Sequence, residues 1–129
     1  MGTEDLLDYE KTEMSNQIWL NELKIARHKL ADFEVKLNEL NMIEQSWEME
    51  VGYQNFKREF QMLEHSISAL QDSIQVLRYS RNNFLKKDSC KIDEDFQALY
   101  EEIKTEMSVF QRVFQKVQID FYDFLVSWM

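Results

Sequence analysis

The sequence predicts an all-α fold, an up-down-up antiparallel three-helix bundle of long helices with an N-terminal helical extension. The first observation is composition: the 129 residues include no proline and only two glycines, Gly2 and Gly52. β and α/β proteins need turn residues at short intervals, which this chain does not supply. The second observation is that apolar residues recur every three or four positions through three stretches of similar length, as in helices that pack together. The chain length suits one domain.

The first helix is expected over residues 15–51 of a bundle that spans 15–129, after an extension at 1–14. Glu44 interrupts its apolar stripe, and two interpretations are open. Either the stripe shifts so that Ile43 enters the core, or a buried carboxylate fixes the register against a base. The stripe consists of Trp19, Leu23, Ala26, Leu30, Phe33, Leu37, Leu40, Glu44, Trp47 and Val51.

Gly52 is expected to end this helix, because glycine readily takes the left-handed conformation found just past helix ends. The apolar stripe also changes phase there, which a chain reversal explains simply. A short turn would make the second helix, at 55–87, an antiparallel neighbour. The alternative is one continuous helix that pairs with a second chain. The second stripe comprises Tyr53, Phe56, Phe60, Leu63, Ile67, Leu70, Ile74, Leu77, Arg81 and Phe84.

The third helix is expected over residues 90–128, after a polar break at 86–93. At about 1.5 Å per residue, the three stripes are each roughly 50 Å long, as an antiparallel bundle requires. In architecture the pattern resembles a spectrin-type repeat, including a Trp in the first helix; this resemblance implies only the fold. The third stripe comprises Ile92, Phe96, Leu99, Ile103, Met107, Phe110, Phe114, Val117, Phe121, Phe124 or Leu125, and Trp128.

Charge supports the antiparallel order. Residues 1–51 carry 12 acidic and 5 basic side chains, residues 52–92 carry 4 and 7, and residues 93–129 carry 8 and 3. A basic middle helix between two acidic helices can select the register of the bundle. The net charge of −9 argues against a nucleic-acid partner. No apolar run approaches the roughly 20 residues that span a bilayer, and no signal-peptide pattern is present, so cytoplasmic residence is expected.

The titratable residues do not form a recognisable catalytic or metal-binding motif, and we expect no enzyme, metal or cofactor. Neither His28 nor His65 has the Glu three residues earlier that metal-binding bundles use. Cys90 is the single cysteine, so it cannot form an internal disulfide. The basic group at the end of the second helix is expected to be neutralised by the acidic starts of the first and third helices. This group comprises Arg78, Arg81, Lys86, Lys87 and Lys91.

Function is expected to be contact with another helical surface, either a second copy in a homodimer or a helical partner. In the predicted topology many aromatic residues gather where the first turn meets the C-terminus. They form either a core of large side chains or a partly exposed patch that binds a partner or an apolar ligand. A small-ligand or sensor bundle with a pocket at this end is therefore the alternative function. The residues predicted to bind the partner are Leu6, Leu7, Met14, Tyr122, Leu125, Val126 and Trp128.

Overall fold

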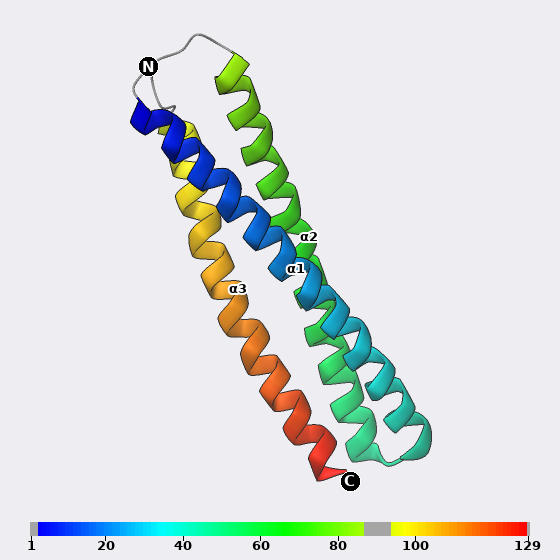
Figure 1. Ribbon diagram of the computed structural model, residues 1–129. Helices are drawn as coiled ribbons and strands as arrows, with labels where there is room; N and C mark the ends of the chain where they lie inside the picture. The colour runs from blue at the N-terminus through cyan, green and yellow to red at the C-terminus, as the bar shows by residue number, and fades with distance from the viewer. Residues whose placement is uncertain (1–2, 87–93, 129) are drawn as a thin grey trace.

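The structure, a computed structural model, describes residues 3–86 and 94–128, and the side chains of residues 10–80 and 95–128. It contains three helices, α1 (Thr3–Ile43), α2 (Trp47–Lys86) and α3 (Glu94–Ser127). Consecutive helices run in opposite directions, and the α1–α2 turn lies at the same end of the bundle as the end of α3 (Figure 1). The prediction of an all-α three-helix bundle is confirmed.

The core runs along α2 from Phe60 to Leu77. This helix packs closely against both α1 and α3, whereas the backbones of α1 and α3 approach each other closely at few places. The predicted stripe of α2 is the best-buried part, because one face of a regular helix repeats every three to four residues. Its buried members are Phe60, Leu63, Ile67, Leu70, Ile74 and Leu77; α1 adds Leu23, Ala26, Leu30, Phe33 and Leu37, and α3 adds Phe96, Ile103, Met107, Phe110, Val117 and Phe121.

The first chain reversal lies at residues 44–46, and the prediction that Gly52 forms this turn was wrong. Ser46 caps α2: its side-chain Oγ accepts a hydrogen bond from the Met49 backbone N–H at 3.1 Å. Glu48 and Glu50 follow in the first turn, where the helix dipole favours negative charge. The first helix therefore ends eight residues earlier than predicted, but the antiparallel order of the helices is unchanged.

Several residues near this turn are consequently placed differently from the prediction. Ile43 and Trp47 are 78% and 77% exposed, and Val51 is also exposed, so none of them belongs to the core. Glu44 lies in the turn, where its backbone N–H donates to the Leu40 carbonyl at 2.9 Å. Both predicted interpretations of Glu44, a shifted stripe and a buried carboxylate, were wrong.

The remaining boundaries agree more closely with the prediction. α1 is continuous from Thr3, so the predicted extension at 1–14 is the first part of this helix. Thr12 and Asn16 are buried, which shows that this part of α1 already packs in the bundle. α3 is described from Glu94, and the predicted start at residue 90 lies outside the described residues.

Gly52 lies within α2, at a position where any side chain would collide with α3. A Cβ atom at this position would lie 2.4 Å from Cε2 and 2.8 Å from Cζ of the Phe124 ring. That ring packs against Phe56, with a distance of 5.0 Å between ring centroids. The glycine thus lets α3 approach α2 closely, and it has no left-handed backbone conformation.

Gly52→Ala is expected to lower the free energy of unfolding by about 1 kcal/mol, because overpacking at Phe124 outweighs the roughly 1 kcal/mol by which alanine favours a helix. The same substitution in a Phe124→Ala background should raise stability by about 1 kcal/mol, since the steric conflict is gone. Urea denaturation of the four proteins measures both effects. A stabilising Gly52→Ala in the otherwise unchanged chain would contradict this account.

Candidate interaction surfaces

A polar network closes the seam between α1 and α2. The guanidinium of Arg27 on α1 reaches three side chains of α2. Its Nε donates to Glu64 Oε2 at 3.3 Å, its Nη1 donates to Gln71 Oε1 at 3.1 Å and its Nη2 donates to Ser68 Oγ at 3.0 Å. A single arginine thereby spans two turns of the neighbouring helix.

Arg78 forms a second link across the same seam. It makes an ion pair with Glu13, in the acidic first part of α1. This pair confirms, for Arg78, the prediction that the basic group is neutralised within the bundle. The side chains of the other members, Arg81, Lys86, Lys87 and Lys91, lie outside the described residues.

Polar and aromatic contacts bridge the seam between α1 and α3. Gln111 donates a hydrogen bond to the Glu22 carboxylate. The hydroxyl oxygens of Ser15 and Tyr100 are 3.2 Å apart, and the Tyr100 ring lies 5.5 Å from the Trp19 ring between centroids. Long side chains therefore connect these two helices, although their backbones are rarely close.

The third seam, between α2 and α3, differs from the other two. No hydrogen bond or ion pair connects residues 47–80 of α2 to residues 97–128 of α3. An open groove of about 400 Å³ runs along it, with Ser66 and Ala69 on the α2 side and Val109 and Val113 on the α3 side. The remaining lining residues are Leu63, Leu70, Thr105, Glu106 and Phe110.

We call the surface around this groove the α2–α3 face. It consists of exposed residues that recur every three or four positions on the side of α2 and α3 turned away from α1. Met62 and Val76 on α2 are 64% and 55% exposed, and Val109 and Val113 on α3 are 46% and 47% exposed. The face comprises Val51, Met62, Ser66, Ala69 and Val76 on α2, and Glu102, Thr105, Glu106, Val109, Arg112, Val113 and Lys116 on α3, all exposed.

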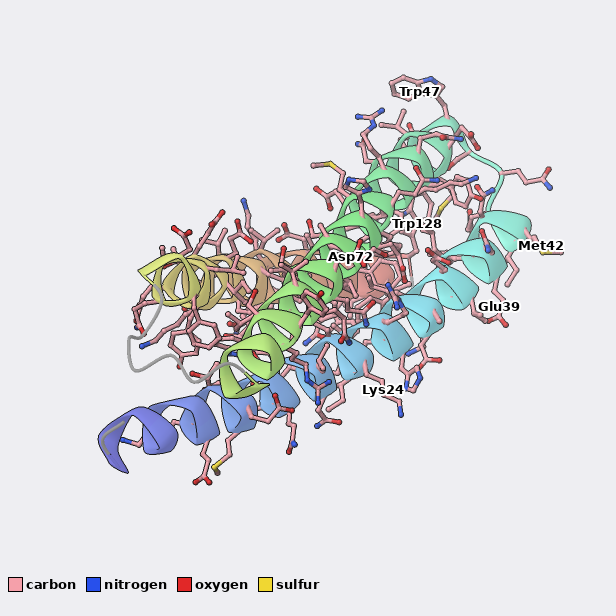
Figure 2. All side chains as sticks on the ribbon, turned by 90° about the horizontal axis from the view of Figure 1, so that it is seen from above. Lys24, Glu39, Met42, Trp47, Asp72 and Trp128 are labelled. Atoms are coloured by element: carbon pink, nitrogen blue, oxygen red, sulfur yellow. The ribbon has the colours of Figure 1, made fainter. Side chains whose placement is uncertain are left out.

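The turn between α1 and α2 carries a second exposed apolar group, the hairpin tip, which consists of Met42, Ile43 and Trp47. Met42 is 75% exposed, and Figure 2 shows Met42 and Trp47 projecting outward from the end of the hairpin. The sequence pattern does not predict this group, because Trp47 falls on the apolar stripe expected for the first helix. Ser46 followed by Glu48 and Glu50 is the sequence signal that could have identified it.

Comparison with protein-family models, with curated proteins and with solved structures finds no match for this chain. Its function is therefore argued from geometry alone.

The structure divides the residues predicted to bind a partner into three groups. Met14, Tyr122 and Val126 are exposed, by 63%, 43% and 69%. Leu125 and Trp128 are half-buried; Leu125 packs against the core, and the Trp128 ring lies 6.3 Å from the Phe124 ring between centroids. Leu6 and Leu7 belong to α1, but their side chains lie outside the described residues.

Closely packed rings fill the interior at the aromatic end of the bundle. Phe121 is central: its ring centroid lies 5.2 Å from that of Phe33, 5.3 Å from that of Phe56 and 5.1 Å from that of Phe60. This packing agrees with the first of the two predicted alternatives, in which the aromatic residues form a core of large side chains. Tyr122, whose ring contacts the edge of Phe33, shows that part of the aromatic end is nevertheless exposed.

The described residues include no group of three or more His, Cys, Asp or Glu side chains that could hold a metal ion. His28 on α1 and His65 on α2 are both exposed. None of the described helices is both long and apolar enough to cross a membrane. Cys90 lies outside the described residues.

Proposed function

We propose that this protein is a non-enzymatic helical interaction or scaffold protein that acts through coiled-coil-like contacts and associates with itself or with a helical partner. The α2–α3 face is the observation that supports this proposal most directly. Polar side chains bridge the other two seams, whereas this one exposes a row of apolar side chains around an open groove. Contiguous exposed apolar surface of this kind is typical of protein interaction sites.

The packing of the aromatic end favours contact over the alternative of an apolar ligand pocket. Phe33, Phe60 and Phe121 are buried and pack against one another, so the interior that a ligand would enter is occupied by rings. The groove of the α2–α3 face, in contrast, is open to the surface between two helices.

Cytoplasmic residence and the exclusion of nucleic acid are parts of this proposal. The single cysteine fits a reducing compartment, and the net charge of −9 would repel a phosphate backbone. The proposal of a non-enzymatic role rests on the placement of the titratable side chains, because catalysis needs such groups to converge in a concave site. The two histidines instead lie on exposed surfaces of different helices.

Size-exclusion chromatography coupled to light scattering tests self-association, over protein concentrations from roughly 1 µM to 1 mM, the range of weak to moderate affinities. The expected result is a mass that rises with concentration from 15.7 kDa toward twice that value. A mass that stays at 15.7 kDa throughout would contradict self-association and would leave only a different helical protein as the partner.

A further inference from the structure

The charges on α3 are arranged with opposite sign on either side of Val109. Glu102 and Glu106 lie seven and three residues before it, and Arg112 and Lys116 lie three and seven residues after it. These spacings place all four charges on the same side of the helix as Val109. All four side chains are exposed, and none makes a hydrogen bond or ion pair with another described residue.

The groove places this charge pattern on the α2–α3 face, because Thr105, Glu106, Val109 and Val113 all line it. The α2 residues that line the groove, such as Ser66 and Ala69, carry no charge. One line across α3 at Val109 therefore separates a basic half, toward the aromatic end, from an acidic half.

We propose that the occupant of the α2–α3 face is a second copy of this chain, related by a two-fold axis that crosses the face at Val109, perpendicular to the helices. A two-fold interface uses the same patch on both subunits, so the patch must be complementary to itself. Here α3 lies antiparallel on α3 of the other copy, and α2 lies on α2. This inference rests on the proposed self-association and specifies its surface and geometry.

The two-fold axis places each of the four unpaired charges of α3 opposite a charge of the other sign. Glu102 faces Lys116 of the partner subunit, and Glu106 faces Arg112 of the partner subunit. Each match occurs twice by symmetry, and together they surround a centre of exposed apolar side chains that supplies the buried area. This centre comprises Met62, Ala69, Val109 and Val113.

The other charges of α3 are compatible with this arrangement. Asp120 would face Ala98 of the partner subunit, so it gains no repulsive neighbour. Asp95 would face Asp123 of the partner subunit, but this match lies two heptads from the axis, where crossed helices have moved apart.

The same charges disfavour the parallel arrangement. If α3 instead lay parallel to α3 of the other copy, each residue would face its own counterpart. Glu102 would then lie near Glu102 of the partner subunit, and Lys116 would lie near Lys116 of the partner subunit. Like charges placed opposite each other oppose association and thereby select against the wrong geometry. The pattern is thus specific for antiparallel copies.

Charge exchange tests the pairing directly. One variant carries Glu102→Lys and Glu106→Lys, and the other carries Arg112→Glu and Lys116→Glu. Each alone should dimerise at least about tenfold more weakly than the original chain, because both matches become repulsive. An equimolar mixture should form a heterodimer with restored affinity, since every match is again attractive. Analytical ultracentrifugation measures both, and circular dichroism checks that each variant is folded.

Matched variants on α1 control for net charge. Lys24→Glu and Lys36→Glu alter two exposed bases, and Asp32→Lys and Glu39→Lys alter two exposed acids. Each control changes net charge as much as one of the test variants, but away from the α2–α3 face. Both should dimerise within about threefold of the original chain, since changes away from the interface alter affinity little.

A cysteine at the axis tests the geometry independently. In a Cys90→Ser background, Val109→Cys should form a disulfide with its own counterpart, because residues on a two-fold axis meet themselves and a disulfide needs Cα atoms within about 7 Å. His28→Cys on α1 is the matched control and should not cross-link.

The outcomes separate this inference from the proposed function. A dimer that persists in both charge variants, or that leaves Val109→Cys uncrosslinked, would overturn the α2–α3 geometry while self-association through another surface stands. Loss of the dimer in both variants without recovery in the mixture would also overturn it. A chain that stays monomeric at every concentration would contradict both the geometry and the self-association.

Discussion

Phe60→Ala is expected to lower the free energy of unfolding by about 3–5 kcal/mol, the usual loss when a buried phenylalanine is truncated. Phe60 is completely buried, and its ring lies 5.9 Å from Phe33, 6.0 Å from Phe56 and 5.1 Å from Phe121 between centroids. The substitution removes one ring that contacts all three helices and leaves a cavity at their junction. Urea denaturation followed by circular dichroism, at one low protein concentration, measures the loss.

Tyr79→Ala provides a matched control for Phe60→Ala. Tyr79 lies on the same helix and is also aromatic, but it is 68% exposed. Its truncation should change stability by no more than about 0.5 kcal/mol, as is usual for surface positions. Equal losses in the two variants would show that the aromatic end does not hold the three helices together.

Asn16→Leu is expected to raise the free energy of unfolding by about 1–3 kcal/mol, because an unsatisfied buried polar group costs about that much. Asn16 is completely buried, and neither its Nδ2 nor its Oδ1 has a hydrogen-bond partner. Leucine has a similar shape and places no polar atom in the core. Thermal and urea denaturation should both show the increase.

Thr12→Val is the control for Asn16→Leu. Thr12 is also buried on α1, one helical turn earlier, but it is engaged in an interaction. Removing its hydroxyl should therefore give no comparable gain. A loss of stability in Asn16→Leu would mean that the amide has a partner, such as a buried water molecule, and a changed oligomeric state would mean that the amide selects register.

The bundle could be predicted from the sequence because each core stripe is a local, periodic property. Phe60, Ile67 and Ile74 are buried as their spacing indicates. The position of the first turn could not be predicted in the same way, because the sequence does not tell whether Gly52 ends a helix or makes room for a side chain of another helix. That glycine accommodates Phe124, which is 72 residues away in the sequence and comes close only after folding.

The candidate site was predictable only in part. The exposure of Met14, Tyr122 and Val126 agrees with their place beside the main stripes. The α2–α3 face was missed because residues such as Met62 and Val109 also lie beside a core stripe. The sequence pattern does not tell which side of a stripe a third helix covers. Their exposure depends on where α1 packs, and the opposed charges become meaningful only when that side is known.

The close packing of α2 against both of its neighbours in sequence has a consequence for folding kinetics. Most contacts between helices join consecutive segments, and the first connection spans only residues 44–46. A chain of this kind closes short loops, loses little entropy before its contacts form and folds on a time scale of roughly microseconds to milliseconds.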